Sequence, residues 1–232
     1  MRIDFLAQQM AERRERILSA AREIIGQRGY EALTMRDLAR ASRVTVPTVY
    51  NLVGSKEEVL FAAIEEQTQR FEAGLGGGSE LPPAERVIAI VEAAASEYLR
   101  MPRYYRTLLT LLFVSDSAHA MRQRVDRAIS RPMGEALSAL QAAGALASWI
   151  ELRPLRGRLR AHLQMTSLQW AVGGVTDDGL RAAARYGAAL LMSAASAGAV
   201  RSYYEEVARA AQPAAIGRTP GAPDEPAVRR TP

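Results

Sequence analysis

The sequence predicts an all-α protein, with a small N-terminal unit of three helices followed by a larger helical domain. Apolar residues recur every three or four positions along most of the 232-residue chain, which is the spacing of one helix face. No stretch alternates apolar and polar residues for long enough to indicate a sheet strand. Helix-capping residues precede several of the apolar patterns, so the elements can be placed in order.

The first helix is expected from about Ala7 to Arg28. Gly29 follows as the residue that ends it, because glycine adopts the left-handed conformation of a helix C-terminus without a steric penalty. The apolar residues of this helix share one face: Ile17, Ala20, Ala21, Ile24 and Ile25. This face covers only a small core, so the three-helix N-terminal unit is expected to pack against the fourth helix of the chain for stability.

Two short helices joined by a tight turn come next. Thr34 is the N-cap of the first, with Asp37 in the place of a capping-box acid. Thr45 caps the second, Val46–Asn51, where Pro47 is tolerated because it falls in the first turn. This arrangement is typical of a helix-turn-helix, whose second helix enters the DNA major groove.

The charge of this segment favours the same interpretation. From Thr34 to Lys56 the basic residues are Arg36, Arg40, Arg43 and Lys56, and the single acidic residue is Asp37. Binding to phosphates requires such a surplus, and the whole chain carries a formal net charge of +5. The alternative is a polar helical hairpin packed on a larger domain.

The remaining helices are placed by caps, prolines and glycines. Ser55 and Glu58 form a capping box for a helix that reaches about Leu75, and Gly76–Ser79 breaks it. Pro132 is expected to kink or split one of the later helices. Those later helices are expected from Pro82 or Pro83 past Tyr98, from 104 to 114, from 117 to about 143, from 154 to 170 and from 177 to about 211.

The chain divides into three parts on this pattern. Residues 1–54 are the expected helix-turn-helix domain, and residues 55–212 are the expected ligand-binding and dimerisation domain. Residues 213–232 are rich in proline and poor in apolar residues, which predicts a disordered tail.

The composition argues against an enzyme or a metalloprotein. The chain has no cysteine and two histidines, His119 and His162, which stand in no metal-ligand motif. It contains no phosphate-binding glycine loop, dinucleotide fingerprint or nucleophile elbow. We therefore expect no catalytic residue, metal or cofactor, and an all-α enzyme with scattered catalytic groups stays as the alternative class. The N-terminus lacks an uninterrupted apolar run and no window approaches a membrane span, so a cytoplasmic protein without membrane contact is expected.

Three pieces of sequence between Arg16 and Ile64 carry a family resemblance. They are RILSAAREIIGQRGYEALTMRDLA, then V-T-x-x-T-V-Y-N, then G-S-K-E-E-V-L. In this order they resemble the DNA-binding domain of the TetR family of bacterial transcription regulators. The resemblance covers the first quarter of the chain. It implies a homodimer that represses transcription until a small molecule releases it from DNA; an activator or a ligand-independent regulator of the same family is the alternative.

Two positions depart from the family pattern. Arg43 stands where the family usually has glycine in the turn, so either the turn is reshaped or Arg43 accepts backbone strain of about 1 kcal/mol. Pro47 stands where a small residue is frequent, which leaves the start of the recognition helix open around Val46 and Pro47.

The resemblance and the polar reach of the side chains suggest two kinds of DNA contact. Tyr50 and Lys56 match phosphate-facing positions of the family, and Thr34 is a further phosphate candidate. Thr48 and Asn51 are the candidates for base contacts, since asparagine pairs with adenine and threonine touches the thymine methyl group.

Thr45 or Arg43 is expected to support these base contacts. The expected partner is a double-stranded DNA operator with the symmetry of an inverted repeat, because a two-fold dimer presents two recognition helices.

An apolar cavity in the second domain is expected to hold an apolar or aromatic effector, with core packing as the alternative for any single residue. The candidates combine aromatic, thioether and amide side chains: Tyr104, Leu108, Met121, Trp149, Met165, Gln169 and Trp170.

The last two helices are the dimerisation candidates. Small residues alternate with larger ones along the final helix, which suits a close helix crossing, at Gly187, Ala188, Leu191, Met192, Ala195 and Gly198. Burial of these residues inside one subunit is the alternative.

Overall fold

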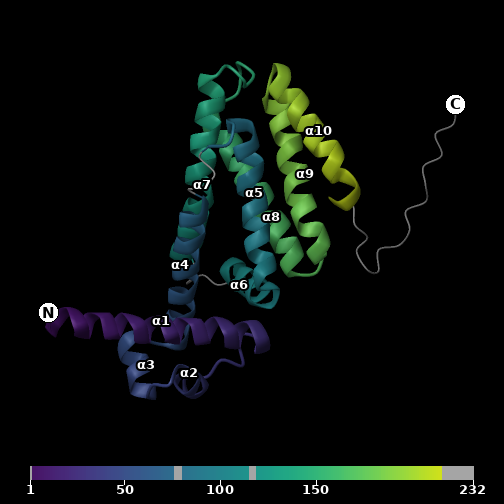
Figure 1. Cartoon of the computed structure of the whole chain (residues 1–232). Helices are drawn as coiled ribbons and strands as arrows, with labels where there is room; N and C mark the ends of the chain where they lie inside the picture. The colour runs from purple at the N-terminus through teal and green to yellow at the C-terminus, as the bar shows by residue number, and fades with distance from the viewer. Residues whose placement is uncertain (1, 76–79, 115–118, 216–232) are drawn as a thin grey trace, which may run out of the picture.

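The computed structural model describes residues 2–75, 80–114 and 119–215, and within these ranges the chain forms ten α-helices and no strand (Figure 1). The predicted all-α class is confirmed. The helices are α1 Arg2–Arg28, α2 Met35–Ser42, α3 Val46–Leu52, α4 Lys56–Leu75, α5 Pro83–Arg100, α6 Pro102–Val114, α7 His119–Ala142, α8 Leu152–Ala171, α9 Asp177–Ala195 and α10 Gly198–Ala215.

The N-terminal unit packs α1, α2 and α3 around a small core. Leu38 of α2 and Val49 of α3 are fully buried against the apolar face predicted for α1. Val59 and Leu60, in the first turn of α4, close this core from the side of the larger domain. The unit therefore shares its core with the helix that leaves it, as three short helices with few apolar residues require.

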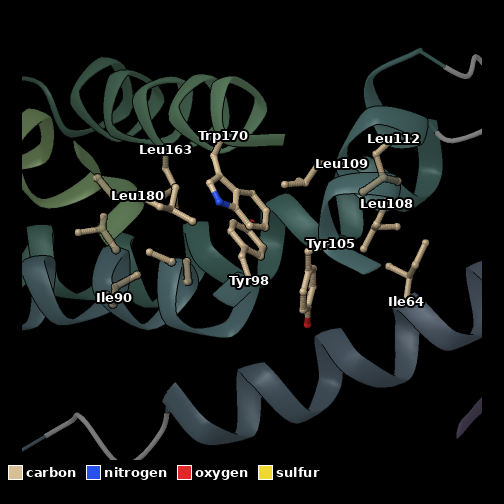
Figure 2. Packing of buried hydrophobic residues seen from close by; sticks show 14 of the residues in the cluster. Ile64, Ile90, Tyr98, Tyr105, Leu108, Leu109, Leu112, Leu163, Trp170 and Leu180 are labelled. Carbon is tan, nitrogen blue, oxygen red and sulfur yellow. The ribbon is translucent and has the colours of Figure 1, made fainter. Parts of the chain in front are cut away.

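The larger domain is a stack of long helices that rises from the N-terminal unit (Figure 1). α4 packs against α7, and α5 lies between α7 and α9. α8 contacts α6, α7 and α9, and α10 packs along α9 at the edge of the stack. The core of this domain is centred on Trp170, Tyr98 and the apolar face of α6 (Figure 2).

The prediction of one final helix to about Ala211 is wrong, because the chain breaks between α9 and α10. Ser196 is extended, with φ −100° and ψ 165°, and forms an isolated antiparallel bridge with Leu146. Backbone hydrogen bonds of 2.9 Å from Ala147 to Ala195 and from Ala197 to Ala145 hold the bridge. The α7–α8 connection thus supplies backbone partners that end α9, which the helical spacing of the sequence does not reveal.

Other expectations need correction or fall outside the described residues. α1 begins at Arg2 rather than near Ala7. α7 continues through Pro132 without being split, because the buried Met133, Ala136 and Leu137 offset the hydrogen bond that proline removes. Residues 213–215 are helical and belong to α10, whereas the rest of the expected tail, the 76–79 break and the expected helix start near residue 117 lie outside the described residues. In the described part of the chain, no helix is both long enough and apolar enough to cross a membrane.

Candidate nucleic-acid interface and ligand cavity

Thr34 fixes the start of α2 by a hydrogen bond to the backbone. Its Oγ1 accepts from the Asp37 N–H at 3.0 Å and donates to Asp37 Oδ2 at 2.9 Å. The predicted N-cap is confirmed, and both side chains lie at the N-terminal end of the helix. Because that end carries free N–H groups and a positive partial charge, it is suited to a nearby phosphate.

The turn between α2 and α3 places a strained arginine at the surface. Arg43 adopts the left-handed conformation, with φ 55° and ψ 47°, so the family geometry is kept and the turn is not reshaped. A residue with a Cβ atom is disfavoured there by about 1–2 kcal/mol. Arg43 is exposed and lies three residues before α3 begins at Val46.

The hydroxyls of Thr45 and Thr48 set the start of α3. Thr45 is the N-cap, and its Oγ1 accepts from the Thr48 N–H at 3.3 Å. The two hydroxyl oxygens are also 2.7 Å apart, so the side chains orient each other. The helix begins at Val46 with Pro47 in its first turn, which resolves the start that the sequence left open.

The rotation of α3 is fixed by its one buried residue, Val49. Since Val49 points into the core, Tyr50 and Asn51 are turned to solvent, and Tyr50 is 52% exposed. Thr48 is half-buried, with its hydroxyl held by Thr45. The short helix therefore presents a phenol, an amide and a hydroxyl within four residues of one another.

Lys56 is held in place by the loop that follows α1. Its Nζ lies 4.4 Å from the centroid of the Tyr30 ring and donates to the Glu31 carbonyl at 3.3 Å. An ammonium has three N–H groups, so donors remain for a phosphate. Gly54, with φ 102°, makes the preceding turn possible, because a Cβ there would stand 2.3 Å from Glu58 Oε2.

Ion pairs and hydrogen bonds join this unit to the larger domain. Arg22 of α1 contacts Glu66 of α4 at 3.0 Å, with side chains only 8% and 19% exposed. Arg70 of α4 contacts Glu15 of α1 at 2.8 Å. Arg103 at the start of α6 donates to the Gln27 carbonyl at 3.3 Å. A movement of α4 or α6 is therefore transmitted to α1.

A small cavity of about 50 Å³ lies between α4, α5, α6 and α7. Figure 2 shows Ile64 of α4 opposite Leu108 and Leu112 of α6, with Tyr98 and Tyr105 at its inner end. The lining is mostly apolar: Ile64, Gln67, Thr68, Phe71, Ala94, Glu97, Tyr98, Tyr105, Leu108, Leu109, Leu112, Val125, Ala128 and Ile129.

The polar groups of the cavity centre on Glu97. The Tyr105 hydroxyl donates to Glu97 Oε1 at 2.6 Å, and the Gln67 amide donates to the same oxygen. Burial and the bond to Glu97 raise the pKa of Tyr105 well above its usual range. Burial raises the pKa of Tyr98 to about 12. Both phenols therefore stay protonated as hydrogen-bond donors at neutral pH.

The cavity contains few of the residues that the sequence suggested. Leu108 lines it, and Trp170 stacks on Tyr98 with ring centroids 6.1 Å apart without being part of the lining. Tyr104 is fully buried near Gly26 of α1, with no hydrogen-bond partner for its hydroxyl among the described residues.

The other candidates lie elsewhere on the molecule. Trp149 is 75% exposed and Met165 is 56% exposed, Gln169 is exposed, and Met121 is half-buried outside the lining. Glu97 and Tyr98 line the cavity, and neither was among the residues that the sequence suggested for it. A carboxylate next to an apolar stripe was the available signal. In the described part of the chain no cluster of His, Cys, Asp or Glu could hold a metal ion.

Comparison with known proteins identifies the N-terminal unit. The family model for "Bacterial regulatory proteins, tetR family" matches residues 17–63, which include α2, α3 and the capped start of α4. This N-terminal unit is the DNA-binding unit of the TetR family.

Relatives extend the TetR likeness beyond this unit. The transcriptional repressor KstR from Rhodococcus jostii (strain RHA1) is 27% identical over 136 residues, which make up 58% of this chain and 64% of KstR. The alignment thus spans less than two thirds of that relative's length.

Two solved structures cover most of the fold. A TetR transcription regulator from Haloarcula marismortui has a TM-score of 0.71 at 14% identity, covering 81% of this chain and 100% of that one. FadR from Bacillus subtilis, in complex with stearoyl-CoA, has a TM-score of 0.63 at 18% identity, covering 76% of this chain and 96% of FadR. At these identities the likeness concerns the fold of the TetR family.

Proposed function

We propose that this protein is a sequence-specific, DNA-binding transcription regulator, and that it acts as a homodimeric repressor released from its operator by a small apolar ligand. The observation that carries the proposal is the continuity between α3 and α4. α3 presents exposed polar side chains beside a basic surface, and α4, which starts four residues after α3 ends, forms one wall of the cavity.

The DNA contacts divide into positioning and reading. Lys56, Tyr50 and Thr34 bind phosphates at the two ends of the helix-turn-helix, where they fix its register on the duplex. Asn51 and Thr48 face the bases in the major groove.

Arg43 and Thr45 support that contact from the turn. Arg43 places a positive charge next to α3, and Thr45 orients the Thr48 hydroxyl.

The ligand acts by widening the cavity. A volume of about 50 Å³ holds a few water molecules and is far below the size of a typical ligand pocket. Binding therefore requires the walls to move apart, and the wall formed by Ile64, Gln67, Thr68 and Phe71 is α4 itself. A ligand that prefers the widened state shifts the population toward it and lowers operator affinity through α4.

The chemistry of the lining and the relatives both support an apolar ligand. Gln67 and Tyr105 gather at Glu97 in an otherwise mostly apolar lining, so the part of the ligand that enters this cavity is an apolar body. KstR is named as a transcriptional repressor, and FadR has been solved with stearoyl-CoA, whose acyl chain is an apolar body of this kind.

The dimer face is proposed on the exposed side of α8 and α9. Met165 of α8 and Leu190 of α9, 56% and 45% exposed, are large apolar residues on a surface that a second copy can cover. By contrast, Ala195 is buried inside the subunit, and a Cβ on Gly187 would stand 2.1 Å from the His162 ring. Changes at those two positions therefore test folding of the subunit rather than dimerisation.

The test of the proposed function is a salt titration of duplex DNA binding. Lys56→Ala removes one phosphate contact, so the slope of log affinity against log salt concentration falls by about 1. Arg209→Ala on α10 is the matched control, because it removes one exposed positive charge far from α3 and leaves the slope unchanged. Equal slopes for the wild type and Lys56→Ala would remove Lys56 from the interface, and absence of duplex binding would refute the proposed function.

A further inference from the structure

The structure contains a second basic surface, away from the helix-turn-helix. A groove between α7 and α8 is lined by one carboxylate, Glu135, and by five arginines: Arg127, Arg131, Arg153, Arg156 and Arg160. The connection between α7 and α8 lies at the end of the molecule opposite α1–α3 (Figure 1). A groove of this charge at this place is not explained by the DNA contacts proposed for α3.

Two of these arginines are available to an anion. Arg131 contacts Glu135 at 3.4 Å and Arg160 contacts Asp126 at 2.9 Å, whereas no ion pair or hydrogen bond in the described part of the chain engages the guanidinium of Arg153 or Arg156. Gly134 leaves room for this pair, since a Cβ there would stand 3.1 Å from Arg156 Nη1.

Side chains connect the groove to the interior. A second cavity of about 40 Å³ shares Tyr98, Leu109, Leu112, Val125 and Ile129 with the first, and it shares Arg160 with the groove.

Polar side chains, among them Asp126, Arg160 and Gln164, line the second cavity, and Arg160 also lines the groove. Asp126 accepts from Arg160 at 2.9 Å and also from the Gln164 amide. Arg160 is 42% exposed, so its guanidinium can turn to another anion, and Asp126, which is 25% exposed, then keeps the Gln164 amide as its partner.

We propose that the groove binds the anionic head, with two or more phosphate charges, of an amphiphilic ligand whose apolar body enters the cavities. Arginine suits this role because its planar fork of donors pairs with phosphate oxygens in a bidentate manner. Arg153 and Arg156 hold the head, Arg160 turns from Asp126 to join them, and the apolar body passes inward along Leu109, Leu112 and Val125. This inference rests on the proposed function, of which it specifies the ligand class.

The test compares amphiphiles with their separate halves, using the full chain in isothermal titration calorimetry at constant ionic strength. The probes are farnesyl diphosphate, compared with farnesol and inorganic diphosphate, and palmitoyl-CoA, compared with palmitate and coenzyme A. At least one amphiphile is expected to bind about tenfold or more tightly than either of its halves, because it uses both sites at once.

Variants separate the two sites. Arg153→Ala with Arg156→Ala is expected to weaken the amphiphile by about tenfold or more and to leave the uncharged farnesol unchanged. Ala128→Leu fills the first cavity, between α4, α5, α6 and α7. This change is expected to weaken binding of the amphiphile and to leave binding of diphosphate unchanged. Arg158→Ala is the matched control, since this exposed arginine of α8 is not part of the groove.

Several results would overturn the inference. They are equal affinity for the amphiphile and its phosphate-free half, failure of both amphiphiles to bind, and amphiphile affinity that is unchanged when Arg153 and Arg156 are replaced. Loss of duplex DNA affinity in the double arginine variant, with unchanged probe binding, would make the groove a DNA surface instead. Each of these outcomes leaves the proposed function intact as long as duplex binding depends on Lys56.

Discussion

At the scale of single residues, Arg43 and Val49 determine the turn before α3 and the rotation of α3, the helix proposed to contact DNA bases. Val49 is fully buried and fixes the rotation of α3, so its neighbours on the other faces reach solvent. Arg43 keeps a left-handed turn that glycine would adopt without penalty, and it is exposed in the turn before α3. Strain retained beside the proposed DNA-binding helix leads to the hypothesis that the Arg43 side chain contributes to binding.

This leads to a prediction with opposite effects on stability and binding. Arg43→Gly removes the strain and is expected to raise the free energy of unfolding by about 1 kcal/mol, while DNA affinity falls with the lost charge. Urea unfolding and fluorescence anisotropy measure the two effects. The control is Arg40→Gly inside α2, which is expected to lower stability by about 1 kcal/mol. A loss of stability in Arg43→Gly would show that the turn is not strained.

At the scale of elements, α4 connects the N-terminal unit, proposed to bind DNA, with the cavity, proposed to bind the ligand. Its first turn completes the core of the N-terminal unit, its middle contacts α1 through Glu66, and its apolar face lines the cavity. One rigid helix with these three contacts can carry a displacement from the cavity to α3.

The Arg22–Glu66 pair is expected to hold α4 on α1. Glu66→Ala leaves the buried Arg22 guanidinium without its partner, so we expect a loss of about 3 kcal/mol in the free energy of unfolding. The adjacent Glu65 is paired with Arg124 at 3.1 Å, and both side chains are 41% exposed. Glu65→Ala is therefore expected to cost less than about 1 kcal/mol. Equal losses in the two variants, measured by urea unfolding, would contradict the importance of the buried pair.

The sequence predicts these elements better than it predicts what they enclose. The caps at Thr34, Thr45 and Ser55 depend on residues three positions apart, and the structure confirms all three. The break at Ser196 depends on a bridge to Leu146, fifty residues away, which no local pattern reveals.

The cavity escaped prediction for the same reason. Trp149 is of a residue type common in ligand pockets, but it lies on an exposed connection between helices. Glu97 is of a residue type common on surfaces, but it accepts hydrogen bonds from Gln67 and Tyr105 of two other helices. Which helices face each other is a tertiary property, and composition does not determine it.

At the scale of the whole molecule, the proposed function requires two copies of the chain. A two-fold dimer sets the spacing between two recognition helices and so the spacing of the DNA half-sites. The exposed apolar residues of α8 and α9 supply a surface for this contact without disturbing the subunit core.

Met165→Arg and Leu190→Arg are expected to break the dimer, because each places an unpaired charge in an apolar interface. Both residues are exposed in the subunit, so circular dichroism should be unchanged. Sedimentation velocity is expected to give a dimer for the wild type and a monomer for the double variant. A dimer of undiminished affinity in the variant would place the interface on another face.

The most direct test of the central claim is selection of duplexes from a random DNA pool by the wild-type chain and by Asn51→Ala. We expect the wild type to enrich an inverted repeat, with half-sites about one helical turn apart or a multiple of it. Asn51→Ala should lose discrimination at one position in each half-site, worth about 1–3 kcal/mol, while its binding to unrelated duplex stays nearly the same. Enrichment of no sequence by the wild type, or the same sequence preference in both proteins, would contradict the account of α3 as the reading helix.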